Sequence, residues 1–291
     1  MSAVPVVCLG ETLWDVLPTG EFLGGAPLNV AAHLTRLGTP ALLVSRVGAD
    51  ERGRRAFSEL KALGLDTSRV QVDPWLPTGE ARATLDAAGA ASYAFLAPAA
   101  WDRIEADEVT LERAHRAAAV VFGTLAQRGT ASAGTVGRIL EGARWRVLDV
   151  NLRPPHDDRE VTLASLARAD FVKLNDTELV TLAGWLGVEP RPAPLLECLA
   201  ARFGTTSLCV TKGAHGALLW HEGEWCEVPA PTTVVVDTVG AGDAFLAMLL
   251  AELLAGTGAP RAMARAARLA AFVASMPGAI PPYEAGTFRG D

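Results

Sequence analysis

The stretch Asp237-Thr238-Val239-Gly240-Ala241-Gly242-Asp243-Ala244-Phe245 joins two hydrophobic segments. Residues 232–236 before it form an extended apolar run that predicts a strand, and residues 244–254 after it predict a helix. A strand, a glycine turn and a helix in this order aim free backbone N–H groups at one point in front of the helix. This point carries the positive end of the helix dipole and therefore suits an anion. Glycine is favoured because a side chain would keep a phosphate or a developing oxyanion away from the amides. By itself, the stretch favours a simpler interpretation in which Asp243 only caps the helix.

The rest of the chain alternates predicted strands with predicted helices. This alternation indicates an α/β fold with a mostly parallel sheet covered by helices on both faces. Because no internal repeat, low-complexity tract or linker interrupts the pattern, we predict a single domain over residues 1–291. The predicted strands cover residues 4–9, 41–47, 118–122, 146–150, 171–174 and 207–210, with a hairpin at 217–220 and 224–228. The predicted helices cover residues 27–37, 50–63, 105–117, 131–142, 162–167, 176–185, 244–254 and 260–275.

One segment departs from the alternation. Residues 79–85 and 91–96 flank the turn-like sequence 86–90 and lack helical periodicity, so we predict a β-hairpin. This hairpin is expected to stand off the main sheet.

Composition excludes several classes of function. The net charge of −7 argues against nucleic acid as a main partner. No apolar run is long enough to span a bilayer, and the N-terminus lacks the basic region of a signal peptide. The four cysteines have no paired spacing and apolar neighbours, so we expect free thiols in a reducing compartment. These features predict a cytoplasmic protein.

Several common site motifs are missing from the sequence. No lysine is followed by Ser or Thr, so there is no GxxxxGK[ST] phosphate loop, and no GxGxxG follows the first predicted strand. The five histidines lack zinc-site spacing. We therefore interpret His33 and His115 as ordinary packing or surface residues.

Polar clusters follow five of the predicted strands, where ligands bind in a doubly wound sheet. Each cluster alone could be a helix cap, a loop charge or a hairpin turn, but five at one sheet edge favour a site. The clusters contain Asp15; Asp149, Asn151 and Arg153; Lys173, Asn175 and Glu178; residues 211–216; and residues 237–243.

Motifs along almost the whole chain resemble the ribokinase family of carbohydrate kinases, the PfkB type. Residues 237–245 are similar to its C-terminal signature and residues 24–31 to its N-terminal diglycine signature. Asn175-Asp-Thr-Glu178 matches its N-x-x-E motif, and residues 210–216 are similar to its nucleotide loop. Residues 10–15, 122–128 and 149–154 look most like the fructokinase branch.

The resemblance implies a ribokinase-like fold and phosphoryl transfer from ATP to a hydroxymethyl group of a small sugar. Asp243 would be the general base, and the amides of Gly240, Ala241 and Gly242 would form the anion hole. Mg²⁺ would be positioned by Asn175 and Glu178, mainly through water, because magnesium dehydrates reluctantly.

Further residues receive roles from the same resemblance. The implied sugar ligands are Asp15, Gly24, Gly25, Asn29, Arg153 and Asp243. The implied ATP-binding residues are Lys173, Asn175, Thr211, Gly213, Gly216, Gly240 and Gly242. A K⁺ ion beside the anion hole would use Asp237 and backbone carbonyls near Val239 and Gly278.

The hairpin would form a lid together with the earlier strand region, over about residues 12–24 and 77–97. A lid excludes water, which would otherwise hydrolyse ATP. Lids of relatives can pair between subunits, so a homodimer through the lid is a further expectation. One departure concerns residues 265–275, which are alanine-rich where relatives often carry an asparagine facing adenine.

Fructose, giving fructose 6-phosphate, is the favoured substrate. The nearest rival is 2-keto-3-deoxygluconate, whose carboxylate would use Arg153 or Arg82. A nucleoside kinase is disfavoured by the sugar-branch sequence at 149–153. A catalytically silent binding or regulatory protein on the same fold is disfavoured by the intact Asp243, Asn175 and Glu178.

Overall fold

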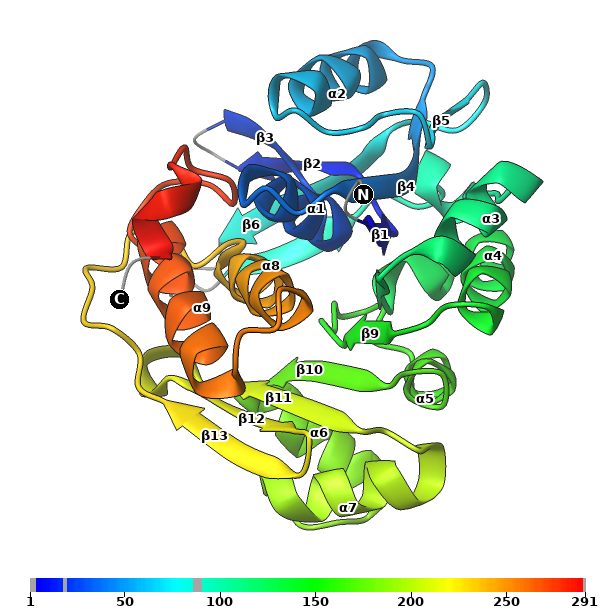
Figure 1. Cartoon of the computed structure of the whole chain (residues 1–291). Coiled ribbons are helices and arrows are strands. Elements are labelled where there is room, and N and C mark those ends of the chain that lie inside the picture. Colours follow the sequence, from blue (N-terminus) through cyan, green and yellow to red (C-terminus); the bar gives the residue numbers. More distant parts are fainter. Residues whose placement is uncertain (1–3, 18–19, 86–90, 290–291) are drawn as a thin grey trace.

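The computed structural model describes residues 4–17, 20–85 and 91–289. In this part of the chain, nine strands form one large sheet and four strands form a separate small sheet. Helices cover the large sheet on both sides (Figure 1). The predicted α/β class and the mostly parallel sheet are therefore confirmed.

The large sheet has the strand order β13-β12-β11-β10-β9-β8-β1-β4-β5. Only β12 and β13 among these strands run antiparallel to their neighbours. The strands are β1 (Val6–Leu9), β4 (Ala41–Gly48), β5 (Val70–Asp73), β8 (Ala119–Gly123), β9 (Arg146–Asp149), β10 (Phe171–Asn175), β11 (Ser207–Thr211), β12 (Ala217–His221) and β13 (Glu224–Val228).

Alternation along β1 explains why its sequence is apolar throughout. Val6 and Cys8 pack into the core on one face of the sheet, whereas Val7 and Leu9 pack into the core on the other. A strand buried on both faces needs hydrophobic residues at every position, because successive side chains point to opposite sides. The continuous run therefore predicted a central strand correctly.

Two groups of helices supply these cores. Helices α1, α2, α8 and α9 contribute residues to the core of one face, and α3 to α7 contribute to that of the other. The bounds are α1 (Ala26–Arg36), α2 (Glu51–Ala62), α3 (Glu108–Arg116), α4 (Thr130–Glu141), α5 (Arg159–Leu166), α6 (Asp176–Leu186), α7 (Pro192–Phe203), α8 (Ala241–Leu254) and α9 (Ala259–Ala274).

The small sheet has the order β3-β2-β6-β7. Its strands are β2 (Leu13–Leu17), β3 (Gly20–Gly24), β6 (Gly79–Leu85) and β7 (Ala91–Phe95). Strands β6 and β7 pair antiparallel, which confirms the predicted hairpin strands, and the turn at 86–90 lies outside the described residues. Parallel pairing of β2 with β6 joins the hairpin to the segment after β1.

Three parts of the sequence prediction need correction. Residues 232–236 are not a strand; Val234 is 82% exposed, and Val236 donates its N–H to the Ala274 carbonyl of α9 at 2.9 Å. An apolar, β-branched run has strand propensity, but a strand also needs a neighbouring strand to pair with. Strand β5 and helix α7 were missed, the helix because prolines open its sequence; they occupy its first turn, where proline is tolerated.

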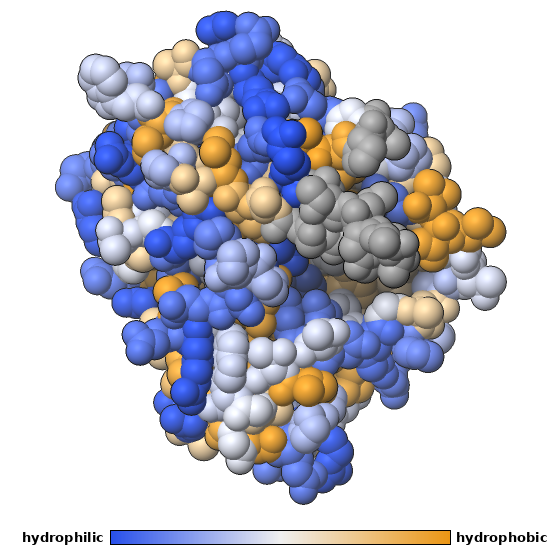
Figure 2. Space-filling model, turned by 180° about the vertical axis from the view of Figure 1, so that it is seen from behind, coloured by the Kyte–Doolittle hydropathy of each residue, from blue (hydrophilic) through white to orange (hydrophobic). Residues whose placement is uncertain are grey.

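The surface opposite the view of Figure 1 is mostly hydrophilic, with hydrophobic residues in separate groups (Figure 2). Within the described residues, no helix is both long and apolar enough to cross a membrane.

Candidate active site

The turn before α8 depends on glycine at position 240. Gly240 is the N-cap of α8 and has a φ of 75°, in the left-handed region. A Cβ at this position would lie 2.5 Å from the Cβ of Ala279. Any other residue would therefore strain the backbone and displace the segment around Ala279.

The first turn of α8 offers backbone donors. The Ala241 N–H donates to the Thr238 carbonyl at 3.3 Å, whereas the N–H groups of Gly242 and Asp243 have no hydrogen-bond partner in the described part of the chain. No side chain caps this helix. Unpaired amides at the positive end of a helix form an anion site, although the Ala241 amide must leave a weak internal bond to join it.

Asp243 lies in the same turn and is 9% exposed. Its Oδ2 accepts a hydrogen bond from Asn29 Nδ2 at 2.8 Å, across 214 residues of sequence. Burial, followed by the negative charge of Asp149, raises the pKa of Asp243, and Lys173 and the Asn29 hydrogen bond oppose that rise. A buried carboxylate with a raised pKa can accept a proton from a bound hydroxyl group.

A buried ion pair lies beneath this turn. Lys173 Nζ is 3.0 Å and 2.9 Å from the two carboxylate oxygens of Asp149, on neighbouring strands β10 and β9. A Cβ at Gly242 would lie 3.0 Å from Lys173 Nζ, so the ammonium group is adjacent to the backbone of the first turn of α8. The charge of Lys173, which the sequence assigned to ATP, is thus shared with Asp149.

Asn175 and Glu178 cap the N-terminus of α6. Asn175 Oδ1 accepts from the Glu178 N–H at 2.8 Å, and Glu178 Oε2 accepts from the Asn175 N–H at 2.9 Å, forming a capping box. Glu178 Oε1 accepts from the Leu152 N–H at 2.8 Å. Burial and then Asp149 raise the pKa of Glu178.

These partners limit how a metal could be held. No group of three or more His, Cys, Asp or Glu side chains among the described residues could hold a metal ion by itself. The remaining lone pairs of Asn175 and Glu178 can accept hydrogen bonds from metal-bound water, and water is the ligand that magnesium gives up reluctantly. The residues therefore fit Mg²⁺ held mainly by water and by ligand phosphates.

The residues suggested for a monovalent cation also meet. Asp237 Oδ1 accepts from the Val239 N–H at 3.0 Å, and Asp237 Oδ2 accepts from the Gly278 N–H at 3.2 Å. This carboxylate therefore joins the segment before α8 to the segment after α9. Both Asp237 oxygens already accept backbone N–H groups, and their remaining lone pairs are free to face a cation.

Asp15, on β2, faces the same charged centre. Its pKa is raised to about 6, first by burial and then by Asp243 and Asp237, while the positive charge of Arg153 lowers it. The Asp15 carboxylate lies directly against Gly24, where a Cβ would collide with it. Gly25, the N-cap of α1, likewise has no space for a Cβ beside the Glu11 carbonyl.

Comparison with known proteins identifies the family of the chain. Residues 9–285 match the pfkB family of carbohydrate kinases. The chain is 32% identical over 261 residues to a fructokinase of Klebsiella pneumoniae, covering 85% of this chain and 83% of that protein. This chain belongs to the pfkB family. It is an ATP-dependent sugar kinase.

Solved structures agree on the fold. An uncharacterised sugar kinase from Pyrococcus horikoshii, solved in complex with ATP, superposes with a TM-score of 0.79 and 27% identity over 94% of each chain. A fructokinase from Vibrio cholerae, solved with fructose, ADP and calcium, superposes with a TM-score of 0.81 over 96% of each chain at 23% identity. The ribokinase-like fold is thereby confirmed.

Three of the predicted ATP-binding residues lie at the end of β11 or in the turn after it, and β11 is the strand next to β10. Thr211 ends β11 and is the register partner of Asn175 on β10. Gly213 has a φ of 52° and Gly216 a φ of 85° in the turn that follows. A Cβ at Gly216 would overlap the Val228 carbonyl, so this turn packs tightly against the end of β13.

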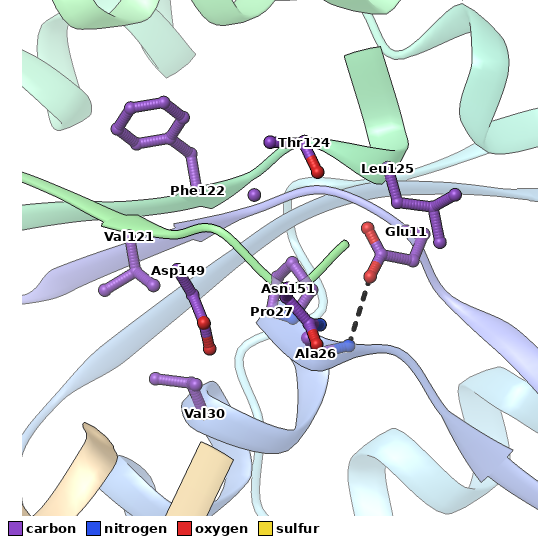
Figure 3. A pocket seen from close by; sticks show the side chains of 11 residues that line it. Glu11, Ala26, Pro27, Val30, Val121, Phe122, Thr124, Leu125, Asp149 and Asn151 are labelled. Carbon is purple, nitrogen blue, oxygen red and sulfur yellow. Dashed lines mark hydrogen bonds between the residues drawn. The ribbon is translucent and has the colours of Figure 1, made fainter. Parts of the chain in front are cut away.

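Glu11 belongs to the site although it was not among the residues predicted from the sequence. Its Oε1 accepts from the Ala26 N–H at 3.2 Å, and its Oε2 is buried without a hydrogen-bond partner. Glu11 lines a cavity of about 10 Å³ whose walls also include Asn151 and Asp149. Figure 3 shows how the three side chains lie. Burial raises the pKa of Glu11 to about 7. The signal was present, because Glu11 is an acidic residue directly after a central strand.

Proposed function

We propose that this kinase transfers the γ-phosphoryl group of ATP to the 6-hydroxyl of fructose, giving fructose 6-phosphate and ADP. The observation that carries the proposal is the Asn29–Asp243 hydrogen bond at 2.8 Å. It joins the helix after the diglycine to the first turn of α8, so the expected sugar contacts and the expected base lie together. The similarity to a fructokinase over most of the chain supports fructose as the sugar.

Asp243 is the proposed general base. The oxygen of the C6 hydroxyl forms a bond to the γ-phosphorus while the bond from that phosphorus to the bridging oxygen of ADP breaks. The hydroxyl proton goes to the Asp243 carboxylate. The raised pKa of Asp243 favours this transfer, because a more basic carboxylate holds the proton more strongly.

The amides of Gly240, Ala241 and Gly242 receive the charge of the transferring group. Phosphoryl transfer needs little covalent help, so positioning and electrostatic stabilisation supply most of the rate. Two features support this role: the missing side-chain cap of α8, and the Lys173 ammonium group beside Gly242.

Metal ions complete the proposed site. Asn175 and Glu178 would hold Mg²⁺ through water, and the ion would neutralise charge on the phosphates of ATP. Asp237, with carbonyls near Val239 and Gly278, would hold K⁺. Thr211, Gly213 and Gly216 would line the nucleotide.

On the sugar side, Asp15, Asn29 and the backbone at Gly24 and Gly25 would bind hydroxyl groups. Arg153 lies close enough to Asp15, Glu11 and Asp243 to lower the pKa of each. The acidic side chains around Arg153 would repel a substrate carboxylate where they are ionised, which favours a neutral sugar over a keto-acid. Arg82 is paired with Glu80 and is less suited to bind a substrate carboxylate.

The small sheet is the proposed lid, closing over the sugar to exclude water. A homodimer would form through the same sheet, whose edge strands β3 and β7 each pair with one strand only among the described residues. Sedimentation with and without fructose tests the dimer. A monomer in both conditions would remove that part of the proposal.

The substrate is tested by ADP release with ATP, Mg²⁺ and K⁺ in the presence of fructose, ribose, glucose, 2-keto-3-deoxygluconate or adenosine. We expect turnover with fructose and identify the product as fructose 6-phosphate by NMR. Turnover chiefly with the keto-acid would overturn the sugar assignment and direct attention to Arg153. No turnover with any acceptor would favour a silent binding protein.

A further inference from the structure

His33 is buried on α1, and each of its two ring nitrogens takes part in a hydrogen bond. Nδ1 lies 2.8 Å from the hydroxyl of Tyr283, and Nε2 lies 3.0 Å from the Ala279 carbonyl oxygen. The imidazole and phenol rings also stack, with centroids 5.7 Å apart. His33 is fully buried, and one helical turn separates it from Asn29, so both side chains lie on one face of α1.

The partners determine where the imidazole proton is. A carbonyl oxygen can only accept a hydrogen bond, so Nε2 carries the proton and donates to Ala279. Nδ1 is then an acceptor for the Tyr283 hydroxyl. Burial lowers the pKa of His33 to about 4, in agreement with a neutral ring.

Ala279 is the residue on which the anion-hole turn rests. A Cβ placed on Gly240 would lie 2.5 Å from the Ala279 Cβ and 2.8 Å from its carbonyl oxygen. The preceding residue, Gly278, donates its N–H to Asp237 at 3.2 Å. His33 on one side and Asp237 on the other therefore hold the backbone at 278–279 against Gly240.

Tyr283 anchors the other end of this loop. The guanidinium group of Arg36 lies 5.0 Å from the centroid of the Tyr283 ring, and Arg36 Nη1 donates to the Pro281 carbonyl at 2.6 Å. Phe272 of α9 packs edge-on against the same ring. Residues 278–283 are thus attached to α1 by polar contacts from His33 and Arg36.

We propose that His33 is a positioning residue, which together with Tyr283 fixes the loop 278–283 behind Gly240 and so sets the anion-hole amides relative to the helix that carries Asn29. The inference rests on the proposed function for the role of that turn. His33 touches neither reacting group. It acts through Ala279, and its effect is to keep Asn29, Asp243 and the amides of α8 in one geometry.

The test compares His33→Phe with His221→Phe. His221 is a matched control because it also pairs Nδ1 with a hydroxyl, that of Ser207 at 2.8 Å, but lies on β12. We expect His33→Phe to lower kcat about 10- to 100-fold, with KM for ATP changed less than threefold, since small displacements of catalytic groups have effects of this size. His221→Phe should leave kcat within about twofold.

A second measurement does not depend on activity. Hydrogen exchange of the unliganded protein should speed up at least about tenfold in peptides covering 278–283 for His33→Phe, and remain unchanged there for His221→Phe. His33→Gln, whose side-chain amide can still donate to Ala279, should restore part of both properties. Tyr283→Phe keeps the ring but removes one donor, and should give a smaller change in the same direction.

The outcomes separate this inference from the proposed function. If fructose is not a substrate but loop exchange rises in His33→Phe, the positioning role stands and the substrate assignment fails. If kcat and loop exchange both match those of His221→Phe, the inference is wrong and His33 is ordinary core packing. If His33→Phe does not fold, Tyr283→Phe decides the question by the same two measurements.

Discussion

Helices α8 and α6 both begin at the carboxyl edge of the large sheet, but their first turns differ. At α6, Asn175 and Glu178 form a capping box in which each side chain accepts the backbone N–H of the other. At α8, Gly240 is the N-cap and no side chain satisfies the amides. A helix that caps itself leaves few donors for a ligand, whereas an uncapped helix can bind an anion. The missing side-chain cap of α8 is therefore the feature that indicates an anion site.

Helix α1 is intermediate between the two. Its N-cap is Gly25, which supplies no side-chain cap, but the distant Glu11 accepts from the Ala26 N–H. The cap of α1 is thus a buried acid from the end of β1. The comparison implies that changes at α8 should affect catalysis, changes at α6 should affect stability, and changes at Glu11 should affect how stability depends on pH.

The largest effect is expected at Asp243 in the first turn of α8. Asp243→Asn should lower kcat by about two to four orders of magnitude while ATP binding is kept, because the amide cannot accept the hydroxyl proton. The matched control is Asp176→Asn, an exposed acid in the first turn of α6, which should leave kcat within about twofold. Steady-state kinetics and calorimetric ATP titration measure both. Near-normal turnover of Asp243→Asn would remove Asp243 from the role of base.

The next effect concerns Glu11 and is measured by pH. Its folded-state pKa of about 7 exceeds the ordinary value of 4.5, so between these pH values the folded state binds more protons than the unfolded state. Stability contributed by this group is therefore present at low pH and is lost as the pH rises through about 7. Glu11→Gln should remove this loss, amounting to about 3 kcal/mol between pH 5 and pH 8.5.

Urea unfolding at pH 5, 7 and 8.5 measures the effect, with Glu51→Gln in the first turn of α2 as a control. An equally steep pH dependence in Glu11→Gln and the parent protein would show that Glu11 is not protonated on folding.

Glycine substitutions sharpen the comparison between α8 and α6. Gly240 and Gly187 have nearly the same φ, 75° and 71°, but a Cβ at Gly187 would meet no atom within 4 Å. Both Gly→Ala variants should lose about 1 kcal/mol of stability from backbone strain. Only Gly240→Ala should also lower kcat, by about 10- to 100-fold, because it displaces the turn. Equal kcat values in the two variants would mean that the turn does not hold the transferring group.

The smallest effect is expected from the capping box. Asn175→Ala should lower the free energy of unfolding by about 1 kcal/mol through loss of the cap, as measured by chemical denaturation. If Asn175 also positions Mg²⁺, the Mg²⁺ concentration for half-maximal rate should rise in this variant, and Thr177→Ala on the same turn should show no such rise. An unchanged Mg²⁺ dependence would limit Asn175 to the cap.

Much of the fold followed from local sequence patterns. The apolar runs at β1 and β8 predicted buried strands because each strand is covered on both faces. Residues 232–236 were wrongly predicted as a strand because their composition resembles that of a buried strand, yet they pair with no strand in the part of the chain that the structure describes. Composition reports local propensity, whereas strand formation requires a pairing partner that the local sequence does not specify.

The candidate site was predictable to the extent that it lies at strand ends. Asp149 and Asn175 were found by that rule and do end β9 and β10, and Glu11 would have been found by its consistent use. Asp15 lies within β2 of the small sheet, and Asp243 was reached from a predicted strand at 232–236 that does not form. The hydrogen-bond partners were predictable only where both residues lie in one turn. Asn175 and Glu178 are paired within one turn and could be expected to bond, but Asp149 with Lys173 depends on the register of β9 and β10.

The sequence alone determined the turn at Gly240, the alternation that gives a mostly parallel sheet, and the family. These depend on residues close together in the chain, where φ preferences and side-chain periodicity act directly. The tertiary structure decided which distant groups meet: Asn29 with Asp243, and His33 with Tyr283, 250 residues away. The reason is that the burial of each group, and the charges around it, come from several elements packed together. The pKa values of Asp243 and His33 are therefore set only when these elements assemble.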